Sequence, residues 1–191
     1  GEVLLALGKA EEARPHLERS AELDPDRERT HFQLGSVLAT MGEREAAIEA
    51  FGAELELTED PKIQTMAHIN RSMLFAEGKQ WAEAAGELEG VVYLDPGHGQ
   101  VYGDLAGFYL RAGDTENAAK ALERGREAGF NSASHYYSLG AMLYRDEKYP
   151  EAVEAFRASL EIDSDLARSE RSLAAALEKT GRGEEALEHL R

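Results

Sequence analysis

The sequence contains no cysteine, and proline and tryptophan are scarce, with five and one in 191 residues. Without cysteine, disulfide bonds and thiolate metal sites are excluded, and the composition fits a reducing compartment. So few prolines leave long stretches in which helices run uninterrupted. The apolar runs are far shorter than the roughly 20 residues that a membrane-spanning helix needs. We therefore expect no direct insertion into a membrane.

Basic residues are also few compared with acidic ones. Lysine and arginine number 21 against 37 acidic residues, a formal net charge of −16. This balance opposes the counterion release that drives binding to nucleic acid, so no nucleic-acid partner is expected. The HExxH, GxSxG and P-loop motifs are missing too. The sequence therefore predicts a protein that is not an enzyme and that uses no cofactor or metal.

A repeat of 34 residues dominates what the sequence does contain, and residues 134–166 show it best. Tyr136, Leu139 and Leu143 have the spacing of one helical face. After a short turn, a second helix has an apolar face that includes Phe156. Neither helix has enough apolar surface to be stable alone. The unit therefore needs copies of itself on either side.

Several columns keep this register along the chain. A small residue on the first helix recurs at Gly35, Ser72, Ala106, Gly140 and Ala174. An alanine on the second helix recurs at Ala13, Ala47, Ala84, Ala118, Ala152 and Ala186. A large apolar residue follows it by four places at Leu17, Phe51, Leu88, Leu122, Phe156 and Leu190. A glycine precedes the second helix at Gly8, Gly42, Gly113 and Gly181. In the third copy Gly78 comes one residue early, which predicts a shorter turn.

This pattern, often closed by Leu-Asp-Pro as at residues 23–25 and 94–96, resembles the tetratricopeptide repeat. The resemblance covers essentially the whole chain. It implies an all-α fold, a right-handed superhelical solenoid of antiparallel helix pairs. Generic amphipathic helix pairs are the alternative, but they would not keep register over six copies.

We expect a single repeat array over residues 1–191. Its members are a partial repeat 1–27, repeats 28–61, 65–98, 99–132 and 133–166, and a partial repeat 167–191, with 62–64 as an insertion. Both ends fall inside a repeat, so the chain is expected to be a fragment of a longer protein. Pro96 to Gly99 is the loosest joint, because two glycines there ease unusual backbone angles.

In this family the first helices line the concave side, and this implies which residues face a groove. The candidate peptide-binding residues are Arg29, Phe32, Met66, Ile69, Met73, Arg111, Tyr137, Tyr144, Arg145, Arg168, Arg171 and Lys179. The same positions also include the small or apolar residues Gly103, Gly107, Leu110, Ala141 and Ala175. Met and aromatic side chains give adaptable apolar contact, and Arg offers a forked donor for carboxylates.

Charge is sorted between this lining and the rest of the chain. The repeat register places five residues of the first helix on this lining in each of the second to sixth repeats. These 25 positions hold six basic and two acidic residues. Arg111, Arg145 and Lys179 stand 34 residues apart and form what we call the basic column. Two explanations stay open: the column faces a ligand, or each side chain stabilises the negative end of its helix.

The sequence thus predicts a protein-interaction scaffold that binds a protein or peptide, with acidic groups in the partner. A family subtype grips a C-terminal carboxylate with Lys, Asn and Arg, but here only Asn70 matches its slots. An alternative is the targeting or regulatory array of a larger enzyme or assembly machine. A further hypothesis is a homo-oligomer formed through uncapped ends. The histidines His31 and His68 share a repeat slot and are assigned to packing.

Overall fold

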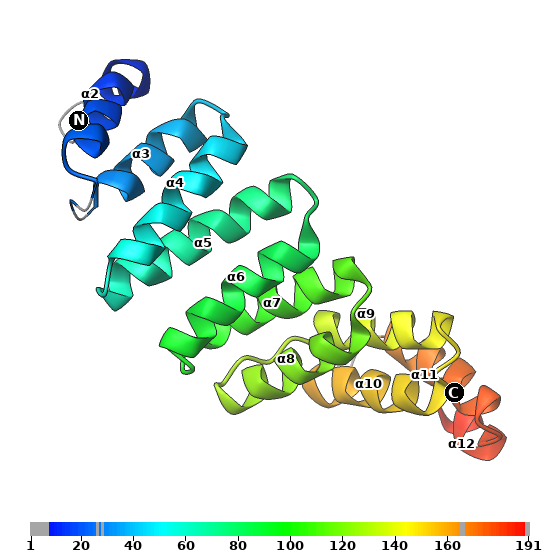
Figure 1. The fold of residues 1–191 in the computed structure, drawn as a ribbon. Coiled ribbons are helices and arrows are strands. Elements are labelled where there is room, and N and C mark those ends of the chain that lie inside the picture. The colour runs from blue at the N-terminus through cyan, green and yellow to red at the C-terminus, as the bar shows by residue number, and fades with distance from the viewer. Residues whose placement is uncertain (1–7, 26, 28, 165–166, 190–191) are drawn as a thin grey trace. The chain divides into compact units, whose positions relative to one another are not determined.

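Helices make up all the regular structure in the computed structural model, which describes residues 8–25, 27, 29–164 and 167–189. Short turns join consecutive helices in this part of the chain (Figure 1). The helices are α2 (Ala10–Leu23), α3 (Thr30–Thr40), α4 (Arg44–Leu57), α5 (Pro61–Glu77), α6 (Trp81–Leu94), α7 (Gly99–Ala112), α8 (Thr115–Glu127), α9 (Ala133–Arg145), α10 (Tyr149–Ile162), α11 (Ala167–Lys179) and α12 (Gly183–Glu188). None of them is both long and apolar enough to cross a bilayer.

The chain divides into two compact units, residues 1–95 and 96–191, and the division falls at the start of the Pro96–Gly99 segment. In the first unit each of α2 to α5 packs on the next helix, and α3 also contacts α5. In the second unit each of α7 to α11 packs on the next helix, and α7 contacts α9 while α9 contacts α11. Each unit therefore has a row of first helices (α3 and α5, or α7, α9 and α11) that contact one another. The second helices alternate with them along the chain.

A glycine facing a phenylalanine ring sets the closest approach between paired helices. A Cβ atom on Gly35 would lie 2.9 Å from the Phe51 ring, and one on Gly140 would lie 2.7 Å from the Phe156 ring. Both rings are essentially inaccessible to solvent, at 0% and 1% exposure. In these two repeats the small residue is therefore glycine because the ring of the second helix occupies the space of a side chain on the first.

The turn between the helices of a pair has one backbone conformation in most repeats. Gly42, Gly113 and Gly181 have φ values of 77°, 84° and 79°, the left-handed conformation that closes a helix. Lys79 and Glu147 take the same slot with φ of 59° and 60°. The prediction of a shortened turn after Gly78 is therefore wrong. That glycine ends α5 with an ordinary φ of −78°, and Lys79 adopts the left-handed conformation instead.

The insertion at residues 62–64 lengthens a helix rather than a loop. It forms part of the first turn of α5, which has 17 residues. Asp60 caps this helix, since its side chain accepts a hydrogen bond from the backbone N–H of Lys62 at 2.9 Å. Pro61 occupies the first helical position, where its missing N–H costs nothing. Ile63 is buried, so the added turn also contributes to the core.

Removing the Phe156 ring should destabilise the second unit. We expect Phe156→Ala to lower the free energy of unfolding by about 3–5 kcal/mol, because the ring is buried against Gly140. Tyr93→Ala is the control, since it deletes an aromatic ring that is 86% exposed. Urea denaturation measures both. A loss below about 1 kcal/mol for Phe156→Ala would contradict the packing.

Glycine should be the better residue wherever another residue holds the left-handed turn position. We expect Glu147→Gly to raise the free energy of unfolding by up to about 1 kcal/mol, because it removes the strain of a positive φ. Gly113→Ala in the equivalent turn should lower it by a similar amount. Thermal and denaturant unfolding of the two variants test the pair, and shifts of the same sign would refute the assignment.

Candidate interaction surfaces

Exposed charge is sorted between the two kinds of helix in the second unit. The exposed charged residues of α7, α9 and α11 are five basic (Arg111, Arg145, Arg168, Arg171, Lys179) and two acidic (Asp104, Glu178). The exposed charged residues of α8, α10 and α12 are two basic (Lys120, Arg126) and eight acidic (Glu116, Glu123, Glu127, Glu151, Glu154, Glu161, Glu184, Glu188). The first helices thus offer a cationic surface on a chain that is strongly anionic as a whole.

The three members of the basic column lie in the last turns of α7, α9 and α11, and all are exposed. Arg111 reaches back along its helix, with Nη1 donating to the Gly107 carbonyl at 3.4 Å. Arg145 pairs with Asp146 through its Nε at 3.0 Å, and its side chain is 68% exposed. The Arg145 contact is local and solvent-facing, so it leaves that cation exchangeable. The helix-end explanation and the ligand explanation are both compatible with these positions.

Tyr137 and Arg168 lie together, which the repeat register did not reveal. The Arg168 guanidinium lies 4.4 Å from the centre of the Tyr137 ring, a cation–π contact between α9 and α11. The Tyr137 ring also packs against the core, because its centre lies 5.7 Å from that of the Phe156 ring. Tyr137 is therefore half-buried and holds an arginine in place. Arg171, one turn further along α11, is exposed.

Some candidate residues serve the scaffold more than the surface. The Tyr144 ring packs edge-on against Tyr149, with centres 5.3 Å apart, so it joins α9 to α10. Phe32 is half-buried and packs edge-on against Phe51 at 5.3 Å. Gly103 and Leu110, expected in the lining, are buried.

Phe130 explains why Gly103 is covered. A Cβ atom on Gly103 would lie 2.5 Å from the Phe130 ring, which comes from the α8–α9 connection. This connection stands where two other repeats have Leu-Asp-Pro, and the Phe130 ring fills the space beside α7.

On its first helices the first unit exposes methionines, whereas the second unit exposes basic residues. Met66 and Met73 on α5 are 49% and 58% exposed, and Ile69 between them is half-buried. Their spacing of three and seven residues places them along one side of the helix. Arg29 is exposed and directly precedes α3, with a left-handed φ of 67°. We call Met66, Ile69 and Met73 the methionine patch.

Glu54 is a structural carboxylate that sequence reasoning missed. It lies fully buried on α4, and its two oxygens accept hydrogen bonds from the backbone N–H groups of Arg29 at 2.8 Å and Phe32 at 3.0 Å. It therefore satisfies donors at the start of α3 and holds Arg29 in its unusual conformation. A signal was present: the equivalent slots in the next repeats hold Val91, Gly125 and Ser159, so a carboxylate stands out.

The histidines have packing and pairing roles. His68 pairs with Glu87 at 2.8 Å, and His189 pairs with Glu170 at 2.6 Å. These pairs use the same two repeat slots, 19 residues apart, with the partners exchanged. No group of three or more potential metal ligands occurs among the described residues.

His135 occupies a more enclosed place beside the basic column. Its Nδ1 lies 2.7 Å from the Ser132 hydroxyl, and its ring packs edge-on against Phe130. Burial lowers the pKa of His135, and Arg111 lowers it further while Asp104 opposes the shift.

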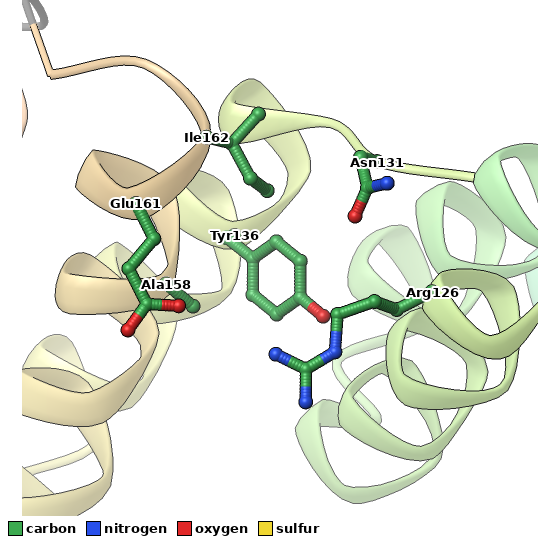
Figure 2. A pocket seen from close by; sticks show the side chains of 6 residues that line it. All are labelled: Arg126, Asn131, Tyr136, Ala158, Glu161 and Ile162. Atoms are coloured by element: carbon green, nitrogen blue, oxygen red, sulfur yellow. The ribbon is translucent and has the colours of Figure 1, made fainter. Parts of the chain in front are cut away.

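A hollow of about 410 Å³ lies away from the basic column, between α8 and α10 (Figure 2). Tyr136 from α9 lines it, with its hydroxyl directed toward Arg126, and Ala158, Glu161 and Ile162 form the α10 side. A second hollow of about 740 Å³ in the first unit includes residues from the same repeat slots: His68, Gly90, Tyr93 and Leu94. The repeat geometry creates both hollows, while their chemistry differs.

Comparison with known proteins shows which repeat this is. Residues 74–143 and 132–162 match models described as tetratricopeptide repeat, and residues 1–71 match one described as bacterial transcriptional activator domain. A MamA crystal structure has a TM-score of 0.62 with 22% identity, covering 84% of this chain and 86% of that one. A double mutant of MamA RS-1 has a TM-score of 0.60 with 25% identity over 86% and 93% of the two chains.

A third solved structure is YrrB, described as "a TPR protein with an unusual peptide-binding site". It has a TM-score of 0.60 and 19% identity, covering 91% of this chain and 88% of that one. The fold is therefore a helical-repeat solenoid, the architecture of protein-interaction scaffolds with extended binding surfaces. Residues 74–162 are therefore tetratricopeptide repeats.

A curated relative shows such repeats within a much longer protein. The general transcriptional corepressor trfA of Dictyostelium discoideum is 27% identical over 141 residues, which is 72% of this chain. This chain matches only 10% of that protein's length.

Protonation of His135 should oppose folding. Because its folded-state pKa is lowered, the unfolded state binds the proton more readily, so stability falls as pH drops through the unfolded value of about 6.5. Above that pH, titration of His135 does not change the free energy of unfolding. Below the folded-state pKa of His135, this free energy falls no further on account of the histidine. We expect wild type to lose more unfolding free energy than His135→Gln between pH 8 and pH 5. Parallel losses in denaturant titrations would contradict this.

Proposed function

We propose that this chain is a non-catalytic scaffold that binds a protein or peptide segment along its first helices. In the second unit the partner contributes carboxylates to the cationic surface around the basic column. In the first unit it contributes apolar side chains to the methionine patch. The sorting of exposed charge between first and second helices is the observation that carries this proposal.

The sorting is informative because neither solubility nor helix formation requires it. Acidic residues on α8, α10 and α12 keep the chain soluble. Basic residues at the ends of α7, α9 and α11 favour the helix dipole, but Arg168 and Arg171 lie in the first half of α11, where the dipole disfavours them. These two exposed arginines therefore support a ligand-facing surface. The peptide-binding site named for YrrB, which shares this fold, is consistent with it.

A charge-reversed surface should fail to capture its partner. We expect the Arg111/Arg145/Arg171→Glu triple variant to lose at least about tenfold of the protein recovered by wild type in a quantitative pull-down, because like charges now meet across the interface. Recovery by wild type should fall with added salt.

The matched control is Lys120/Arg126/Lys148→Glu, which makes the same charge change outside the first helices. It should capture as much partner as wild type. Circular dichroism checks that both variants remain helical. Equal recovery by the folded triple variant and wild type would overturn the basic-surface proposal.

A second candidate follows from two of the comparisons. The match of residues 1–71 to a bacterial transcriptional activator domain and the similarity to a transcriptional corepressor both concern gene regulation. In this case the array would be the partner-binding part of a larger regulator and would not contact DNA itself. Deleting the array from the full-length protein should abolish recruitment of its partners to a reporter gene while DNA occupancy stays unchanged.

A further inference from the structure

The basic column has a fixed spacing, and that spacing limits what it can bind. The first helices α7, α9 and α11 contact one another in order. Axes of packed helices lie about 8–10 Å apart. Residues in one repeat slot on these helices therefore recur at about that interval. Arg111, Arg145 and Lys179 occupy such a slot in the last turn of each helix.

Small residues lie one helical turn before each member of the column. These are Gly107, Ala141 and Ala175, of which Ala141 is exposed and the other two are half-buried. Without long side chains at these positions, a partner's main chain can lie close to the helices while its side chains reach the cations. An α-helix, with a diameter of 10–12 Å, would stand further from this floor. The small residues thus favour an extended segment.

Several acidic residues lie close to the column in the sequence. Asp146 pairs with Arg145, Glu178 is adjacent to Lys179 in sequence, and Asp104 lies two turns before Arg111. Exposed pairs of this kind are weak, so a partner carboxylate can replace the contact between Arg145 and Asp146.

In the extended polyproline II conformation the chain has about three residues per turn and advances about 3.1 Å per residue, so every third side chain points the same way and recurs at about 9 Å. We propose that the second unit selects an extended acidic segment whose carboxylates stand at every third position, one for each cation of the basic column. This inference rests on the proposed function and adds the register of the partner. Carboxylates two or four residues apart would span too little or too much to meet all three cations at once.

Three nonapeptide isomers test the register. Each consists of six prolines and three aspartates, with the aspartates two, three or four residues apart, and proline-rich chains favour the polyproline II conformation. Their affinities for the whole chain are measured by fluorescence polarisation at low salt. We expect the isomer with aspartates three apart to bind about fivefold to tenfold more tightly than the other two. A peptide with asparagine in place of aspartate gives the non-ionic baseline.

Two variants separate a ligand role from a helix-end role. Arg145→Gln removes the middle cation and should abolish the difference between the isomers, whereas Arg126→Gln on α8 should leave it intact. Melting temperatures are recorded for both. If Arg145→Gln lowers the melting temperature but leaves the isomer difference unchanged, Arg145 is a helix-end stabiliser and the inference is wrong.

The outcomes also distinguish the inference from the proposed function. Equal binding of the three isomers above the asparagine baseline would overturn the register and leave the basic surface as a binding site. A fourth probe is a helical peptide with glutamates every seventh residue, which also repeats at about 10 Å. Binding of this probe alone would replace the extended partner by a helical one. Failure of all four acidic probes would overturn both proposals.

Discussion

Close packing between a small residue on the first helix and a large apolar side chain on the second is the constraint on which the repeats depend, and a glycine facing a phenylalanine ring is its tightest form. Gly35 and Phe51 form it in one unit, and Gly140 and Phe156 form it in the other. The absent side chain lets two helices approach closely, and the ring seals the space between them. These groups face inward, and exposed residues of the first helices such as Met73 and Arg145 lie outside this contact. The candidate interaction surfaces include such exposed residues.

Charge and apolar surface are then distributed on the two units in different ways. In the second unit the first helices carry cations, one of them held on Tyr137. In the first unit α5 carries exposed methionines, and a buried glutamate organises the start of α3. The same scaffold thus presents two chemistries. Adaptable thioethers suit varied apolar partners, whereas fixed guanidinium groups suit carboxylates.

The sequence predicted the fold well because repetition gives each helix several independent signals. The alanine column was predicted for the second helices, and Ala47, Ala84 and Ala118 are buried there. Errors arose where one repeat departs from the others. Lys79 adopts the backbone conformation that Gly78 was expected to supply, and Phe130 covers a position expected to be open. The stacking of Arg168 on Tyr137 was not foreseeable, because register alone gives no side-chain direction.

The two exchanged histidine–glutamate pairs bear on how such arrays change over time. His68 pairs with Glu87, and Glu170 pairs with His189, each within one helix pair. Duplicating or deleting a whole pair of helices keeps both partners together. A crossover between the first helix of one repeat and the second helix of the other would instead join histidine to histidine or glutamate to glutamate. Recombination at the connections between helix pairs would therefore keep each histidine with its glutamate.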